Sequence, residues 1–592
     1  MIPRERRIRI TAAVFLCCLA LLLAGIKHPP IIALWEAAVV YYVFNPVVKP
    51  LPVLAIQEGA DSAGYHGRFG YACLTASRWL ADIVGHNLFV VRLLPILYGL
   101  ICLFLFYIVV RRWFGWYVAS VAGALLVTNQ VFLVFQHSLL PQVLTLATIL
   151  FCVERLQILN KKPDVGAVLT LGLAFALAGI HYIIGRICIL AILAFCVIDF
   201  ERLSAPGGQS LRRLSSRRRL KITAAAFISM LLWLTLFYPR NLLLFFNREF
   251  IFSRLGEYAN DAAGGWECII HNARYFLSYA VLHNHPWSYS SDIMVHIQYP
   301  VEGKFIIVLM IIGVVSQLKN LRQDKILMLL YLFGIVMLAN LLSLVDTSRS
   351  FETSTTLSSF RTFFVSPFIV IFASLALAAI AAKLKQRHSH LGLMAHILIV
   401  GLILTRAFLH FSEVHRFQRT VDSHVFDFSQ PAVQKKLDDP ILPVIERREL
   451  HLNQIYFYRL AQTVKEQLKE KDQRGPGRML IYIPAAVYTP AHYHVGGRVP
   501  TRGDPYYFQM FLTLYLRDAG VNVSYLIRRA DLVGRYGGWL LRPNGKAETA
   551  SHFIVNPIGL KKPEYILVAS EEELKALEDA GETEIVFAFP ER

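Results

Sequence analysis

Charged residues are scarce in this sequence. Only 17% of the 592 residues are Asp, Glu, Lys or Arg, whereas 55% are hydrophobic and the mean hydropathy is +0.47. An average soluble domain is about a quarter charged, and a soluble chain this apolar would need to hide more surface than a core offers. Soluble enzymes, secreted disulfide modules, coiled coils and disordered proteins are therefore excluded. The composition predicts a polytopic membrane protein with room for one soluble domain.

Two further absences narrow the class of membrane protein to which the chain can belong. The eight cysteines fall mostly inside apolar runs and show no Cys-x-x-Cys spacing, so we interpret them as small core residues rather than metal ligands or redox groups. No small-residue cleavage site follows the basic N-terminus and its apolar stretch, which ends in Lys27-His28-Pro29-Pro30. We therefore expect a retained first span and not a cleaved signal peptide.

Long apolar runs dominate the first two thirds of the chain. A helix needs roughly 17–25 apolar residues to cross a bilayer, and runs near this length recur eleven times. The predicted spans are 8–26, 88–110, 117–136, 140–156, 164–180, 182–199, 222–239, 304–319, 326–345, 362–382 and 392–410. The sequence thus predicts about eleven transmembrane helices.

The distribution of basic residues predicts the orientation of these helices. With the N-terminus in the cytoplasm, the segments that become cytoplasmic carry 22 Lys and Arg residues against six Asp and Glu. This positive-inside pattern accounts for most of the net charge of +19, so nucleic-acid binding is not needed to explain the charge. The Arg-rich stretch 212–219 is expected to meet anionic lipid headgroups. Segments 27–87, 240–303 and 346–361 then lie outside, as does the C-terminus.

Residues 411–592 have a different composition, in which Lys and Arg nearly balance Asp and Glu. Short apolar runs at 479–484, 521–527, 565–569 and 584–589 predict strands, and the patterns at 441–472, 505–519 and 570–580 predict helices. We expect a soluble extracytoplasmic α/β domain after a transmembrane domain of residues 1–410. This division predicts a membrane fold of about eleven helices with a C-terminal α/β domain.

Several motifs follow one another in a recognisable order. The first outside loop opens with Trp35-Glu36-Ala37 and leads to Gly85-His86-Asn87 and then Arg92-Leu93-Leu94-Pro95 before the second span. The tenth span begins with Phe360-Arg361 and reaches Pro367. Their order and topology over residues 1 to about 410 resemble the GT-C glycosyltransferases, in particular the superfamily of protein O-mannosyltransferases and lipid A aminoarabinose transferases.

The resemblance implies that a sugar passes from a polyprenyl-phosphate carrier to a glycan, lipid or protein acceptor outside the cytoplasm. The acid after the first span would be the base, and Glu36 holds that position. A carboxylate at the membrane edge can accept the proton that an attacking hydroxyl loses. Asp61, with Glu58 beside it, is the alternative base. The structural alternative for Glu36 is a solvated interfacial carboxylate.

A phosphate leaving group needs cations outside the cytoplasm. The candidates are Arg274, Arg349, Arg361 and, inside the sixth span near its outer end, Arg186. Guanidinium groups bind phosphate bidentately, and an ionisable residue at membrane depth suggests a functional site. The alternative for each is a side chain that reaches the interface to keep its charge in water.

Two departures from the family pattern leave other functions open. Trp35 stands where the family carries an Asp, and Gln142, after Pro141 and near His137, stands where many members carry an acid at the start of the fourth span. With these carboxylates missing, the usual oxygen ligands of a divalent metal are absent, so we assign no cofactor, and a divalent metal stays an unsupported alternative. His137 and Gln142 remain candidate substrate-binding residues. The alternatives are a catalytically degenerate structural subunit of a membrane complex and a lipid or sugar transporter. We expect a multi-pass protein of the plasma (inner) membrane.

Overall fold

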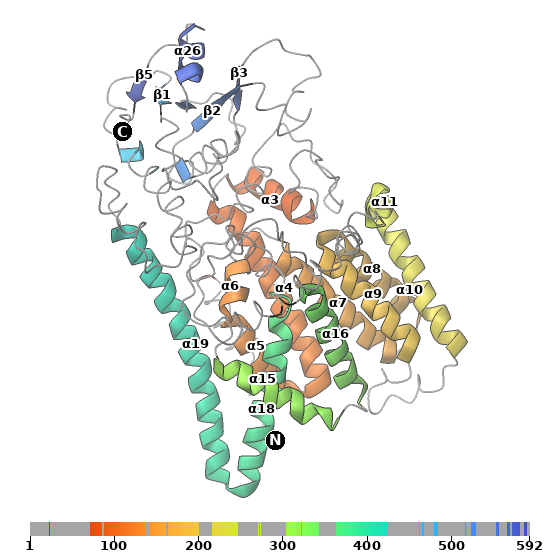
Figure 1. The fold of residues 1–592 in the computed structure, drawn as a ribbon. Helices are drawn as coiled ribbons and strands as arrows, with labels where there is room; N and C mark the ends of the chain where they lie inside the picture. Colours follow the sequence, from red (N-terminus) through yellow and green to blue (C-terminus); the bar gives the residue numbers. More distant parts are fainter. Residues whose placement is uncertain are drawn as a thin grey trace.

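The computed structural model describes thirteen helices of the membrane part and a sheet in the C-terminal part. The described residues are 71–85, 88–136, 141–161, 164–199, 216–246, 304–320, 323–341, 363–423, 464–466, 479–482, 515–516, 523–528, 552–555, 565–568, 571–579 and 585–588, with the single residues 23, 270, 273 and 461. The helices are α3 (Tyr71–Val84), α4 (Leu88–Phe114), α5 (Trp116–Val127), α6 (Gln130–Gln136), α7 (Gln142–Lys161), α8 (Val165–His181), α9 (Ile183–Asp199), α10 (Ser216–Phe237), α11 (Arg240–Phe245), α15 (Lys304–Leu318), α16 (Asp324–Leu341), α18 (Ser366–Arg387) and α19 (Ser389–Ser423). Figure 1 shows them side by side in one bundle, with the sheet at one end.

Five of the described helices are long and apolar enough to cross a membrane, namely α4, α7, α10, α18 and α19. Five shorter apolar helices, α5, α8, α9, α15 and α16, lie among them. Every predicted span from 88–110 onward overlaps one of these helices, which confirms a helical membrane fold. The first predicted span, 8–26, lies outside the described residues, so the count of eleven stays a prediction.

The predicted span 117–136 is wrong as a single helix, because the chain breaks between α5 and α6. The Thr128 hydroxyl donates to the Ala124 carbonyl at 2.8 Å, and the Asn129 side chain accepts from the backbone N–H of Phe132 at 3.0 Å. The Asn129 bond caps the start of α6, and a Thr bond to the carbonyl four residues earlier tends to bend a helix. The Arg406 Nε of α19 donates to Thr128 Oγ1 at 3.2 Å and ties this break to another helix.

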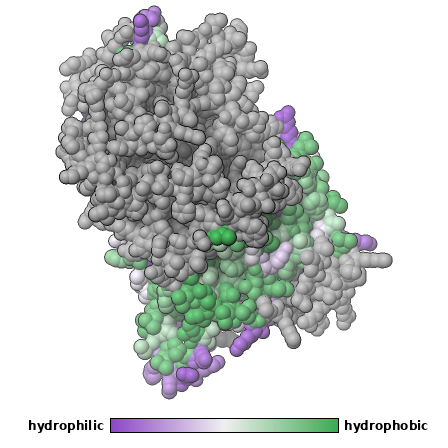
Figure 2. Space-filling model, viewed as in Figure 1, coloured by the Kyte–Doolittle hydropathy of each residue, from purple (hydrophilic) through white to green (hydrophobic). Residues whose placement is uncertain are grey.

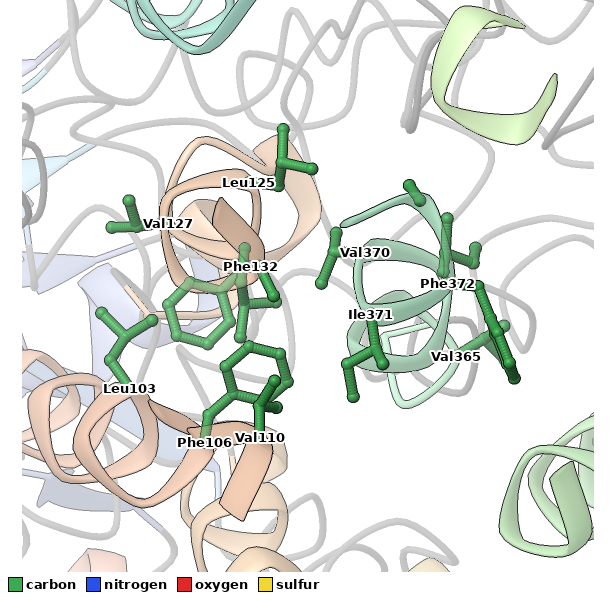
Figure 3. Packing of buried hydrophobic residues seen from close by; sticks show 14 of the residues in the cluster. Leu103, Phe106, Val110, Leu125, Val127, Phe132, Val365, Val370, Ile371 and Phe372 are labelled. Carbon is green, nitrogen blue, oxygen red and sulfur yellow. The ribbon is translucent and has the colours of Figure 1, made fainter. Parts of the chain in front are cut away.

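The core of the bundle forms where α4, α5, α6 and α18 meet. Phe106 of α4, Leu125 of α5, Phe132 of α6 and Val370 of α18 belong to one buried apolar cluster. Figure 3 shows side chains of this cluster projecting from these helices toward one another. A second buried cluster, built largely from α7, α8, α9 and α10, lies beside it. Burial of apolar side chains holds the two groups of helices together.

The outer surface of the bundle is also apolar. Large hydrophobic side chains are exposed on α10, α15 and α19, among them Leu236, Val308 and Leu398. Figure 2 shows this hydrophobic surface, with hydrophilic residues at the lower tip. Soluble proteins rarely expose apolar surface on this scale, so the surface fits contact with lipid chains.

Basic residues meet at one end of the bundle, which we call the Arg112 end. Arg112, in the last turn of α4, forms an ion pair of 2.7 Å with Glu154 of α7. Lys325, in the first turn of α16, donates to the Trp113 carbonyl at 2.8 Å, and Gln157 of α7 donates to the Val109 carbonyl at 3.3 Å. The segments predicted to be cytoplasmic thus come together, while the orientation of this end stays a prediction.

The C-terminal part contains a five-stranded sheet of order β3-β2-β4-β1-β5. The strands are β1 (Met479–Tyr482), β2 (Val523–Arg528), β3 (His552–Val555), β4 (Tyr565–Val568) and β5 (Ile585–Ala588), and helix α26 (Glu571–Asp579) follows β4. All pairs are parallel except β2 with β3. Four strands and α26 lie where the sequence predicts them, whereas β3 does not. Helices 441–472 and 505–519 lie mostly outside the described residues, so the domain as a unit stays a prediction.

Candidate functional site

The other end of the bundle, which we call the Gln142 end, is where α7 and α9 begin and α8 ends. Close packing at Gly185 fixes this corner. A Cβ atom on Gly185 would lie 2.0 Å from the carbonyl oxygen of Ala178 in α8 and 3.4 Å from the Thr145 methyl group in α7. No side chain fits at the first distance, so glycine lets α9 begin directly against α8.

Arg186 lies at this corner, in the first turn of α9, and is only 4% exposed. Its Nε–H donates to the Gly179 carbonyl at 2.8 Å, near the C-terminus of α8. Its guanidinium carbon lies 5.5 Å from the centre of the Phe245 ring in α11. The helix end carries partial negative charge and the ring face attracts cations. Both contacts therefore favour a buried positive charge at this place.

Gln142 is the first residue of α7 and is fully buried, with 0% exposure. Pro141 precedes it, and the Pro141 carbonyl accepts a hydrogen bond from Thr145 Oγ1 at 2.7 Å. Within the described part of the chain, neither Oε1 nor Nε2 of Gln142 has a hydrogen-bond partner. Leaving such atoms unpaired costs about 1–3 kcal/mol each. A buried amide of this kind calls for a binding role or ordered water.

Aromatic rings form a layer at the same end. Phe363 and Phe364 lie just before α18, with their ring centres 5.2 Å apart. Phe364 stacks on Tyr182, which lies between α8 and α9, at 6.0 Å, while Phe363 contacts Phe132 and Phe135 of α6 at 6.1 and 5.1 Å. The layer joins α6, the connection between α8 and α9, and the segment just before α18.

An apolar cavity of about 40 Å³ extends from this layer toward the Arg112 end. Phe364 and Pro367 line it at one end and Trp113 lines it at the other, with side chains of α4, α7, α9, α16 and α18 between them. The lining residues are all apolar except for the Trp113 ring nitrogen and the Cys188 thiol. The lining is therefore apolar and offers few hydrogen-bond partners to a sugar, and a volume of about 40 Å³ is small packing space inside the bundle.

Two buried polar residues at or near this end were missed by the sequence reasoning. Gln136, the last residue of α6, is 0% exposed, and His181, the last residue of α8, is 2% exposed. Among the described residues, both amide atoms of Gln136 and the Nδ1 of His181 have no hydrogen-bond partner. In the sequence, each of these residues is a polar residue at the end of an apolar run. Many helix ends that contact water show the same pattern, so it does not single out a buried polar group.

The structure therefore brings Arg186 and Gln142 to one end of the bundle. The other predicted site residues lie outside the described part of the chain, and their roles stay predictions: Glu36, Asp61, His137, Arg274, Arg349 and Arg361. In the described residues there is no group of three or more His, Cys, Asp or Glu side chains that could hold a metal ion.

Comparison with known proteins adds a family relation. Residues 76–207 match the family model described as dolichyl-phosphate-mannose-protein mannosyltransferase, which confirms the resemblance that the motifs indicated. No curated protein matches the sequence.

The solved structures that are similar to the chain include an oligosaccharyltransferase and an ArnT. One is the apo oligosaccharyltransferase of Archaeoglobus fulgidus, at 12% identity and a TM-score of 0.46, with 74% of this chain and 60% of that chain covered. The other is ArnT of Cupriavidus metallidurans bound to undecaprenyl phosphate, at 14% identity and a TM-score of 0.40, with 85% and 86% covered. The chain spans about 60% of the length of the archaeal protein.

Proposed function

We propose that this chain, related through residues 76–207 to the GT-C membrane glycosyltransferases, transfers a sugar from a polyprenyl-phosphate donor to an acceptor on the extracytoplasmic side of the plasma membrane. The observation that carries the proposal is a buried cation, Arg186, at one end of an apolar membrane bundle. An ionisable group at such depth is costly to keep and is usually functional. A lipid phosphate is the anion that reaches this place from the bilayer.

The donor would bind in two parts. Its phosphate lies at the Gln142 end, where Arg186 donates hydrogen bonds to it and supports the negative charge of the leaving group. Its isoprenoid chain lies along the bundle, and the exposed apolar side chains of the bundle surface support this placement. Arg274, Arg349 and Arg361 are the further cations that the sequence offers to the phosphate.

The reaction would be a single displacement at the anomeric carbon. An acceptor hydroxyl attacks that carbon, the bond from the carbon to the phosphate oxygen breaks, and the phosphate leaves with the electron pair. Glu36 takes the proton of the hydroxyl, with Asp61 as the alternative base. One displacement inverts the configuration at the anomeric carbon, by analogy with glycosidases.

The test is transfer of labelled sugar in proteoliposomes. The purified protein is supplied with polyprenyl-phosphate-linked mannose and with extracted cell-envelope lipids, glycans or proteins as acceptors. We expect label to move to one acceptor fraction while polyprenyl phosphate is released in equal amount. No release above empty liposomes with any neutral sugar donor would contradict the proposal.

A second function follows from Gln142 and Trp35, which replace the acids of the family pattern. A protein without these carboxylates could serve as a structural subunit of a membrane complex. That function predicts no sugar transfer, and it predicts stable membrane-protein partners that co-purify with the chain after mild solubilisation.

A further inference from the structure

Two buried glutamines flank residues 137–140. Gln136 ends α6 and Gln142 begins α7, and both are 0% exposed. Their four amide atoms have no hydrogen-bond partner within the described part of the chain. Gln157, a half-buried glutamine near the Arg112 end, donates through Nε2 to a backbone carbonyl, while its Oε1 has no partner among the described residues. Gln136 and Gln142 thus differ from Gln157 in that neither of their amide atoms is paired.

The chain is built to hold Gln136 where it is. The break at Thr128 and Asn129 redirects the backbone into the short helix α6, and Phe132 and Phe135 of that helix pack against Phe363. Gly99 of α4 then leaves space for the Gln136 side chain: a Cβ atom on Gly99 would lie 2.6 Å from the Gln136 Cδ. The amide is thus fixed by packing and not by hydrogen bonds.

A side-chain amide has one acceptor oxygen and two N–H donors. A sugar hydroxyl is also both donor and acceptor, so two amides can bind neighbouring hydroxyls of one ring. Aromatic rings beside such groups offer apolar surface to the C–H face of a sugar, and sites of this kind combine aromatic walls with few polar groups. A water molecule would pair with part of these donors and acceptors, whereas the several hydroxyl groups of a pyranose or furanose ring offer more partners.

We infer that Gln136 and Gln142 together bind the hydroxyl groups of a neutral hexose or pentose, so that they select the sugar on the lipid carrier. This inference rests on the proposed transfer from a polyprenyl-phosphate donor. It adds the sugar class and a specificity residue, Gln136, that the sequence motifs did not indicate.

The experiment separates the sugar from its carrier. Binding of polyprenyl-phosphate-linked mannose, glucose and arabinose is compared with binding of the bare polyprenyl phosphate, on the full-length protein in nanodiscs. We expect at least one sugar-bearing lipid to bind more tightly than the bare lipid. We call the ratio of the Kd for the bare lipid to the Kd for the sugar-bearing lipid the gain. In Gln136→Leu and Gln142→Leu the gain falls by about 5- to 30-fold, which is the effect of one or two lost hydrogen bonds. Binding of the bare lipid stays unchanged.

Matched variants separate a binding role from a structural one. Gly99→Ala pushes the Gln136 amide aside without changing its chemistry, so it should also lose the gain. Gly123→Ala should keep the gain, because nothing lies within 4 Å of its added Cβ atom. Gln136→Leu should not lower the melting temperature, because it removes unpaired buried atoms. Gln157→Leu should keep the gain, because this side chain bonds to the Val109 carbonyl at the other end of the bundle.

The outcomes distinguish this inference from the function on which it rests. A wild-type gain that persists in Gln136→Leu and Gln142→Leu overturns the inference and leaves the proposed function in place. A wild-type protein that binds the bare lipid but gains nothing from any of the three sugars overturns it as well. Failure of the wild type to bind either lipid refutes the proposed function. If a leucine variant also fails to bind the bare lipid, Gln136→Asn is compared in its place, because it shortens the side chain and keeps the amide. Loss of the gain in affinity then supports the inference, and an unchanged gain overturns it.

Discussion

Replacement of Arg186 by methionine tests whether this residue binds the donor phosphate. The change keeps a long unbranched side chain and removes every guanidinium donor. If Arg186 donates one charge-assisted hydrogen bond to the phosphate, its loss costs about 1.5–3 kcal/mol. The Kd for polyprenyl phosphate should therefore rise about 10- to 150-fold.

The fold should tolerate this change. The variant loses the hydrogen bond to the Gly179 carbonyl and the contact with Phe245, whose worth is about 0.5–2 kcal/mol. It also avoids the burial of a charge at membrane depth, which costs about 2.5–3.5 kcal/mol on insertion scales. These opposing effects are of similar size, so we expect little change in thermal stability.

The assay compares polyprenyl phosphate with the neutral polyprenol of the same length. Only the phosphate lipid should lose affinity in Arg186→Met. Arg155→Met is the matched control, because Arg155 also lies over a phenylalanine ring, at 5.1 Å from Phe151, but belongs to the Arg112 end. Equal affinity of wild type and Arg186→Met for polyprenyl phosphate would refute the phosphate role and leave Arg186 as a cap of α8.

Three other predictions concern separate parts of the chain. Glu36→Gln should lower sugar transfer roughly 10²–10⁴-fold with donor binding retained, as loss of a general base does; parental transfer rates would remove Glu36 from the mechanism. Glu154→Gln should lower the free energy of unfolding by roughly 1–3 kcal/mol, because it breaks the 2.7 Å ion pair with Arg112. A double-mutant cycle with Arg112→Met should give a coupling energy above zero. Cysteine labelling should find Ser215→Cys on the cytoplasmic side and Ala530→Cys outside, and labelling of both from one side would contradict the predicted topology.

The sequence predicted the membrane part well because hydrocarbon thickness dictates helix length. The apolar run 88–110 became α4, and the run 392–410 lies within α19. It did not predict the break after Val127, because Asn129 caps the start of α6 through a side-chain bond and hydropathy does not change there. Nor did it predict that α19 continues to Ser423, beyond the apolar run.

The candidate site was predicted only in part. Arg186 stood out because a charge inside an apolar run is rare, and Gln142 stood out because it replaces an acid in a motif. Gln136 gave no such signal, since its significance depends on Gly99, which lies far away in the sequence and beside it in the fold. Whether a buried amide has a partner is a property of packing, and hydropathy patterns carry no information about it.

The central claim is that a polyprenyl phosphate binds with its charged end at Arg186, at the Gln142 end of the bundle. The most direct measurement is an electron cryo-microscopy structure of the full-length protein in nanodiscs with saturating polyprenyl phosphate. We predict density for a phosphate within hydrogen-bond distance of the Arg186 guanidinium, continuing into an isoprenoid chain along the apolar surface of the bundle. A phosphate bound at the Arg112 end, or no lipid density at the Gln142 end under saturation, would contradict the account.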